Sequence, residues 1–329
     1  MQIEQAPLHC SRLSLSFHKI GCGSAMQIEQ APLHCSRLSL SLQSDSINVM
    51  EEATGTDINT LEILHPEVWS LAIRISSGNL SYAIHSRMED NSLVYGNITL
   101  TENASGIKEI ETAIYDNRFF LYEYERRTIL LESPHFLIVP DEFSAENRQE
   151  ECERYYRYLY PDDKYIIRTD HIDNSAVTMA YGISQELDSF LRRTFDNPPI
   201  MHSLTPIVQF FKKRDSFGST NKMYAYLYNG TVEILGIRSN KIVFANFFKF
   251  TEINDAFYYI MNVWHTIGFD CANDEMHILG EKQYRKTLLA ELRRYIRNVI
   301  QSIFPAQLLR LGKNAMNAPF DLIILPLCE

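Results

Sequence analysis

The densest group of side chains that could bind a metal or transfer protons is Asp170, His171 and Asp173. Carboxylates and imidazoles are common ligands of metal ions and common general acids and bases. Their spacing spreads them over opposite faces of an extended segment, so only His171 with Asp173, or Asp170 with a distant residue, could converge. We therefore interpret this segment as a solvated turn, and we predict no catalytic residue and no metal ligand.

Sequence motifs of the common enzyme classes are missing. The chain contains no GxGxxG, GKS/T, GxSxG or HExxH pattern, which disfavours each of the corresponding chemistries. Cysteines at positions 10, 22, 35, 152, 271 and 328 form no CxxC pair, which argues against a zinc site or a disulfide framework and fits a reducing cytoplasm. His202 precedes a predicted helix, and we interpret it as a capping or packing residue.

Four tyrosines in one charged segment are candidates for an interface: Tyr155, Tyr156, Tyr158 and Tyr160. Tyrosine combines a large apolar ring with a polar tip, so clusters of it suit hydrated protein–protein interfaces. A helix that packs against a sheet buries tyrosines for the same reason. Both hypotheses stay open.

The composition is that of a globular protein, with 45% apolar residues in a chain of 329. The net charge of −10 is spread along the chain, which disfavours binding to nucleic acid or anionic lipid. We interpret the basic run 212–214 as a solvated loop. No apolar run approaches the roughly 20 residues of a membrane helix, and we expect neither a membrane span nor a secretory signal.

The first 49 residues contain an undiverged repeat, because MQIEQAPLHCSRLSLS occurs at 1–16 and again at 26–41. The repeat has too little apolar periodicity to stack on a copy of itself. We interpret residues 1–49 as a disordered tail, either an artefact of cloning or gene prediction or a very recent duplication. Met1, Met26 and Met50 each remain a candidate start, and only Met50 precedes sequence of globular character.

The elements that must position any site follow a repeated order. In the first half, a hairpin at 69–76 and 80–85 and a strand at 92–100 precede a helix with isoleucines at 107, 110 and 114. Extended segments at 128–139 and 176–181 and helices at 144–160, 185–195 and 205–213 follow. In the second half, strands at 222–228, 231–238 and 241–248 precede a helix at 252–267, a strand at 276–279, a helix at 283–300 and strands at 307–311 and 322–325.

Two units of the form βββαβα predict a duplicated α/β protein with two lobes, at 50–215 and 216–329. Asn229-Gly230 is the strongest hairpin signal in the chain, and we expect both residues to have positive φ.

At these segments the chain resembles the actin-like ATPase (ribonuclease H-like) folds, in which each lobe opens with a three-stranded meander and a helix. More closely, it resembles a family of uncharacterised bacterial proteins recorded as a domain of unknown function with an actin-like fold. The resemblance rests on LAIRISSGNLSYAI, ESPHFLIVPDEF, IMHSLTPIVQFF and MYAYLYNGTVEILGI through to MHILGE, and covers about 61–325.

The resemblance implies a nucleotide site between the lobes, and the residues at that position depart from the active pattern. Active members of the wider class hold phosphate and magnesium with an Asp-x-Gly loop in the first hairpin of each lobe. Here the first loop is Ser76, Ser77 and Gly78, with Arg74 or a serine in place of the carboxylate. The second is Asn229 and Gly230, and Glu281 follows Gly280 where a glycine pair usually contacts the adenosine.

From these departures we expect no cofactor and no ATP hydrolysis. We predict a non-catalytic actin-like protein of the cytoplasm, a pseudo-ATPase that binds an unknown protein partner or acts as a scaffold. The alternative is a divergent nucleotide-binding ATPase or kinase that uses the cleft between the lobes.

Overall fold

The computed structural model describes residue 63 and residues 65–100, 106–143, 148–172, 176–214, 220–302 and 305–328. All of them belong to one compact unit, Met50–Glu329. The predicted tail, the three candidate start methionines, Asp173 and the predicted lobe boundary at 215/216 lie outside the described residues.

Two five-stranded sheets share one topology, with the orders β3-β2-β1-β4-β8 and β11-β10-β9-β12-β13. In each, the first three strands are antiparallel and the last two run parallel to the first strand. The first sheet contains β1 (Trp69–Ser76), β2 (Asn79–Ser86), β3 (Val94–Thr99), β4 (Arg126–Leu131) and β8 (Ile200–His202). The second contains β9 (Lys222–Tyr228), β10 (Thr231–Arg238), β11 (Lys241–Lys249), β12 (Glu275–Gly280) and β13 (Asn298–Gln301). The predicted two-lobed α/β fold with a meander at the start of each lobe is confirmed.

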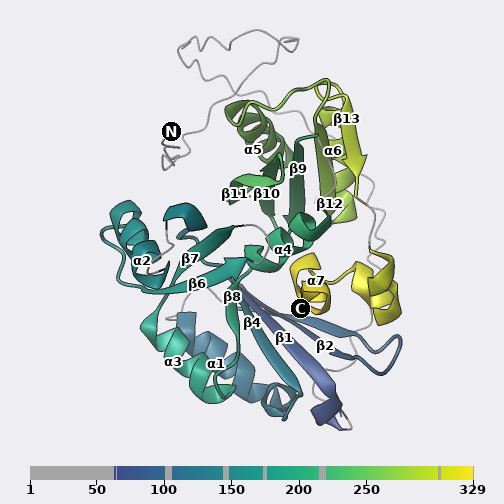
Figure 1. Ribbon diagram of the computed structural model, residues 1–329. Helices are drawn as coiled ribbons and strands as arrows, with labels where there is room; N and C mark the ends of the chain where they lie inside the picture. Colours follow the sequence, from purple (N-terminus) through teal and green to yellow (C-terminus); the bar gives the residue numbers. More distant parts are fainter. Residues whose placement is uncertain are drawn as a thin grey trace, which may run out of the picture. The chain divides into compact units, whose positions relative to one another are not determined.

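Helices accompany both sheets (Figure 1). They are α1 (Gly106–Asp116), α2 (Arg148–Leu159), α3 (Gln185–Thr194), α4 (Leu204–Arg214), α5 (Ile253–Thr266), α6 (Lys282–Leu292) and α7 (Phe320–Cys328). Local sequence fixes several of their ends. The Ser184 hydroxyl accepts a hydrogen bond from the Leu187 N–H at the start of α3, and Glu252 and Asp255 form a reciprocal capping box at the start of α5.

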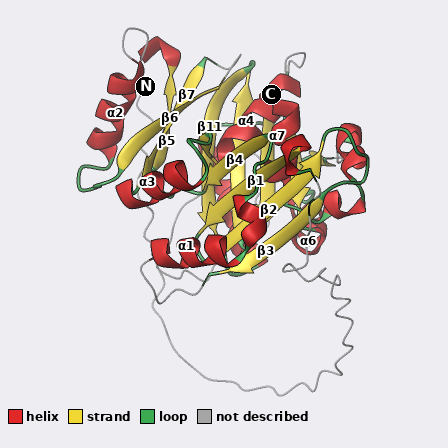
Figure 2. Cartoon of the chain, turned by 90° about the horizontal axis from the view of Figure 1, so that it is seen from below, coloured by secondary structure: helices red, strands yellow, loops and turns green. Residues whose placement is uncertain are grey.

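An insertion separates the fourth strand of the first lobe from its helix. It consists of β5 (Phe136–Pro140), α2, β6 (Ile166–Ile172) and β7 (Val177–Ile183), and its strands form a sheet with the order β5-β7-β6. These elements gather at one side of the first sheet (Figure 2). The second lobe has no counterpart to it among its described residues, and there the order βββαβα holds without interruption.

Three predicted elements of the second lobe are wrong. The helix predicted at 283–300 ends at Leu292, because the chain turns at 293–295 and then adds β13 in parallel to β12. The strand predicted at 307–311 is the 3₁₀ segment Ala306–Leu311, and the strand predicted at 322–325 lies within α7. A short apolar run does not distinguish a strand from a buried helix, and α7 is apolar on nearly all sides because it is buried.

The hairpin between β9 and β10 has the geometry predicted for it, since Asn229 has φ 48° and Gly230 has φ 70°. Replacing Gly230 by valine is expected to lower the free energy of unfolding by about 1–3 kcal/mol, because a β-branched residue is strained in this backbone region. Urea denaturation measures the change.

Gly106→Val is the matched control, because a Cβ at Gly106 would meet no atom within 4 Å and the residue has no positive φ. Its cost should stay below about 1 kcal/mol. Equal losses in the two variants would show that turn geometry is not what makes Gly230 necessary.

Candidate functional site

The first hairpin turns of the two lobes border one cavity. Its volume is about 350 Å³, and its lining comprises Ser76, Ser77, Glu132, Asn229, Gly230, Thr231, Lys249, Phe250 and Thr251. The structure thus brings together four of the six loop positions singled out in the sequence. Gly78 and Gly280 do not line the cavity.

The two lobes build this site with equivalent strands. The Glu132 N–H donates to the Ile75 carbonyl oxygen at 2.9 Å, and the Glu281 N–H donates to the Leu227 oxygen at 3.0 Å. Each glutamate therefore follows the strand that lies parallel to the first strand of its lobe. By the same register, Arg74 in β1 corresponds to Tyr226 in β9.

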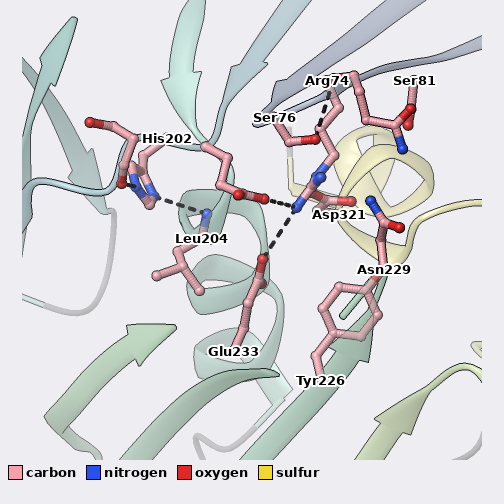
Figure 3. A network of polar contacts seen from close by, with 12 residues as sticks. Arg74, Ser76, Ser81, His202, Leu204, Tyr226, Asn229, Glu233 and Asp321 are labelled. Carbon is pink, nitrogen blue, oxygen red and sulfur yellow. Dashed lines mark hydrogen bonds and ion pairs between the residues drawn. The ribbon is translucent and has the colours of Figure 1, made fainter. Parts of the chain in front are cut away.

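Arg74 occupies the space between the lobes (Figure 3). Its Nε donates to Asp321 Oδ2 at 2.6 Å and its Nη2 to Glu132 Oε2 at 2.9 Å, and Nη2 lies 3.6 Å from Glu233 Oε1. Only 2% of the Arg74 side chain is exposed, and the three carboxylates are also buried. We call these four residues the Arg74 cluster. It ties β1 and the end of β4 to β10 of the second lobe and to α7.

The Arg74 cluster has three carboxyl groups for one guanidinium, so burial cannot leave all of them charged. Burial, followed by the charge of Asp321, raises the pKa of Glu233 to about 8. Its Oε2 has no hydrogen-bond partner among the described residues. Glu233 therefore holds a proton at neutral pH. Burial also raises the pKa of Tyr226 well above its ordinary value, and the Tyr226 hydroxyl accepts the Phe320 N–H at 2.8 Å.

The second hairpin turn is already bound by a carboxylate of the chain itself. The Asn229 N–H donates to Glu281 Oε1 at 2.7 Å. A phosphate needs free backbone N–H groups at such a turn. The Asn229 N–H is not free, because the Glu281 carboxylate already accepts its hydrogen bond.

Gly280 serves the packing of β12 against β9 and not the approach of a ligand. Its φ is 103°, and a Cβ there would lie 1.9 Å from the Leu227 carbonyl oxygen. Only glycine permits so close an approach of two backbones.

Further contacts join residues of the two lobes. The hydroxyls of Tyr95 and Tyr228 lie 3.0 Å apart, and the guanidinium carbon of Arg74 lies 5.5 Å from the centre of the Tyr228 ring. Lys212, predicted to be solvated, is buried in α4 and donates to Asn240 in the turn between β10 and β11. α4 and α7 pack against each other in the space between the two sheets (Figure 1).

A magnesium–nucleotide complex does not fit these residues. A divalent cation would need the carboxyl groups that already surround Arg74, and the guanidinium would repel it. Among the described residues, no group of three or more His, Cys, Asp or Glu side chains is arranged to hold a metal.

Asp170 and His171 lie on a strand and not in the predicted solvated turn. Asp170 Oδ2 accepts hydrogen bonds from the His202 N–H at 2.7 Å and the Thr205 hydroxyl at 2.6 Å, which joins β6 to the start of α4. Burial raises the pKa of Asp170 to about 6. The His171 side chain is 40% exposed. The turn prediction is wrong because four polar residues, 168–171, conceal the strand pattern of β6.

His202 is buried, and both of its ring nitrogens are engaged. Nε2 lies 3.0 Å from the Ser133 carbonyl oxygen, and Nδ1 accepts the Leu204 N–H at 3.1 Å at the start of α4. Burial lowers the pKa of His202 to about 4, so the ring is neutral at physiological pH. Its position is that of a capping residue.

The four candidate interface tyrosines divide by burial. Tyr156 is fully buried and Tyr160 is partly buried, and both pack within the insertion, so Tyr156 is not available to a partner. Tyr158 is 86% exposed, and Tyr155 is partly exposed. An interface at this helix would rest on Tyr158.

No sequence motif singled out Glu132, Glu233 or Asp321, the three acidic residues of the Arg74 cluster. A signal for them exists, because Glu233 interrupts the apolar strand TVEILGI and Asp321 interrupts the run FDLIILPL. Charged residues in such surroundings are seldom buried unless they are paired. Which charges meet could not be read from the sequence, since Arg74 and Asp321 are separated by 247 positions.

Comparison with solved structures supports the fold. A protein of Bacteroides thetaiotaomicron with an actin-like ATPase fold and unknown function matches with a TM-score of 0.67 and 23% identity, over 80% of this chain and 97% of the other. A chain of the PilM-PilN type IV pilus biogenesis complex matches at a TM-score of 0.45 and 10% identity, over 80% of this chain and 100% of the other. The second similarity is too low to support a conclusion.

No protein of curated function matches the sequence. In the part of the chain that the structure describes, no helix combines the length and the apolar character that a membrane span requires. The model of the family described as "Protein of unknown function (DUF3822)" matches residues 58–299. The chain therefore belongs to this family, as the resemblance in its sequence predicted.

Proposed function

We propose that the protein is a non-catalytic, actin-like scaffold of the cytoplasm that acts by binding another protein. The Arg74 cluster is the observation that carries the proposal. A guanidinium surrounded by three buried carboxyl groups takes the position between the lobes at which a catalytic member of the fold would need an exchangeable cation. The cluster also joins the two lobes. A scaffold benefits from such a link, because it keeps the binding surface in one conformation.

The alternative is a divergent nucleotide-binding ATPase or kinase, and one observation favours it. The cavity between the hairpin turns is lined by the hydroxyls of Ser76, Ser77 and Thr231 and by Lys249, and its volume lies within the range of small-molecule sites. Glu132 also faces this cavity and would oppose an anion there.

We expect millimolar ATP with magnesium neither to raise the melting temperature nor to be hydrolysed above background. A ligand that binds only the folded state stabilises it by about 2.7 kcal/mol at a concentration 100 times its dissociation constant, so a real site would be visible. Differential scanning fluorimetry and a phosphate-release assay measure the two quantities.

Lys249→Glu is the control variant. Lys249 is exposed and lines the cavity, so the substitution reverses the charge of this side chain without removing a buried contact. If ATP with magnesium raises the melting temperature of the wild type but not that of this variant, the nucleotide-binding alternative is favoured over the scaffold.

The scaffold itself is tested by affinity purification of the full chain from cells that express it. A defined protein should be retained in stoichiometric amount with or without ATP. Retention of no protein, or retention only with ATP, would contradict the proposal.

A further inference from the structure

A second cavity lies in the insertion, away from the Arg74 cluster. Its volume is about 450 Å³, and it is lined by His135, which precedes β5, by Leu159 at the end of α2 and by the following loop, residues 160–165. The insertion is the part of the first lobe that has no counterpart in the described second lobe, so the architecture of the duplicated fold does not require it.

His135 is held in one orientation in this cavity. Its Nδ1 lies 2.6 Å from Asp163 Oδ2, and its ring stacks on Tyr160 with 4.6 Å between centroids and 14° between planes. Burial raises the pKa of Asp163, but hydrogen bonds from Tyr156, His135 and the Tyr165 N–H outweigh it, and the net pKa is lowered. Asp163 therefore remains a carboxylate, and Nδ1 carries the proton.

The loop that carries Asp163 is itself fixed. Arg157 donates to the carbonyl oxygens of Asp163 and Tyr165, and the Tyr156 hydroxyl donates to Asp163 at 2.7 Å. A side chain held by such a second layer of hydrogen bonds is preorganised for binding.

The contrast with His202 shows what is unusual about His135. The His202 ring is fully buried and uses both nitrogens within the fold. The His135 side chain is 45% exposed, and its Nε2 makes no hydrogen bond to any residue that the structure describes. With Nδ1 turned toward Asp163, Nε2 is the ring nitrogen that faces the cavity, and in the Nδ1–H tautomer it accepts a hydrogen bond.

The lining restricts the chemistry of a ligand. Asp162 and Asp163 contribute two carboxylates against the single ammonium group of Lys164, so an anion gains nothing from entering. Pro161, Tyr160 and Tyr165 offer flat, largely apolar walls, which suit a planar ring. The acceptor Nε2 then requires an O–H or N–H donor on that ring.

We propose that this cavity binds a tyrosine side chain of a partner protein, with the phenol hydroxyl donating to His135 Nε2. The inference rests on the proposed function, and it names the place of contact and the chemistry recognised there. The exposed Tyr158 lies on the preceding helix, α2, of the same insertion.

The test uses N-acetyltyrosinamide as the probe, with the full chain and long-range proton–nitrogen NMR of the histidine rings. The His135 Nε2 resonance, assigned by its loss in His135→Phe, should shift saturably at millimolar probe. N-acetylphenylalaninamide lacks the donor and should bind about tenfold more weakly, as expected for the loss of one hydrogen bond. His171, comparably exposed on β6, is the internal reference and should not shift.

His135→Phe keeps an aromatic ring to stack on Tyr160 and should bind the two probes equally well; its melting temperature verifies that it folds. Equal affinities of the wild type for both probes, or no saturable shift, would overturn the proposal. If His135→Phe still retains the wild type's partner in affinity purification, the scaffold proposal stands and this site falls. If the tyrosine probe binds but no partner protein is retained, the recognition of a phenol by this cavity stands and the scaffold proposal falls.

Discussion

Replacing Arg74 by alanine is expected to lower the free energy of unfolding by about 3–5 kcal/mol at neutral pH, as is typical when one partner of a buried ion pair is removed. The variant leaves the carboxyl groups of Glu132, Glu233 and Asp321 close together, buried and without their cation. Urea denaturation of the wild type and the variant measures the loss.

Arg74→Lys tests the geometry separately from the charge. Lysine keeps the positive charge but cannot donate to Asp321 and Glu132 through a planar fork, so we expect an intermediate loss. Arg193→Ala, on the exposed surface of α3, should change stability by less than about 0.5 kcal/mol. A loss below about 1 kcal/mol for Arg74→Ala would show that the cluster does not hold the lobes together.

The sequence was informative where a local pattern decides the structure. The Asn229-Gly230 turn, the meander of each lobe and the helices α3 and α5 follow from turn residues, alternation and capping groups that lie within a few positions of one another. These features predicted the two-lobed architecture and placed the turns that border the cavity.

The sequence was misleading where burial decides the structure. The polar residues of β6 predicted a turn, yet Asp170 accepts hydrogen bonds from residues of β7, β8 and α4. The apolar run of α7 read as a strand, although its place between the sheets makes a helix apolar on nearly all sides. The Arg74 cluster joins four distant segments, so it could be recognised only once the chain was folded.

Glu233→Gln is expected to remove a pH dependence of stability that the wild type shows between about pH 4.5 and pH 8. The ordinary pKa of a glutamate, 4.5, applies to the unfolded chain, whereas burial beside Asp321 raises the folded value to about 8. In this interval the folded state keeps a proton that the unfolded state has released. Stability is therefore complete below the lower value and falls as the pH rises, by at most about 1.4 kcal/mol per pH unit.

Glutamine has nearly the shape of a protonated glutamate and cannot ionise. The variant should therefore match the wild type to within about 1 kcal/mol at pH 5 and exceed it by more than about 1 kcal/mol at pH 9. Asp170, with its raised pKa, and His202, with its lowered pKa, also contribute pH dependence, with opposite signs. Asp170 and His202 are present in both the wild type and Glu233→Gln, so their contributions cancel in the difference between the two unfolding free energies.

Arg74, Glu132, Asp321 and Tyr226 face Glu233, so a second variant is needed to assign the pH dependence to Glu233 itself. Asp321→Asn resolves this point, because Asp321 accepts a hydrogen bond from Arg74 Nε and its neutral form would weaken that contact. If Asp321→Asn removes the pH dependence and Glu233→Gln does not, the proton belongs to Asp321. If both variants keep the wild-type slope, neither Glu233 nor Asp321 is the group that causes the pH dependence, and the raised pKa of Glu233 is contradicted.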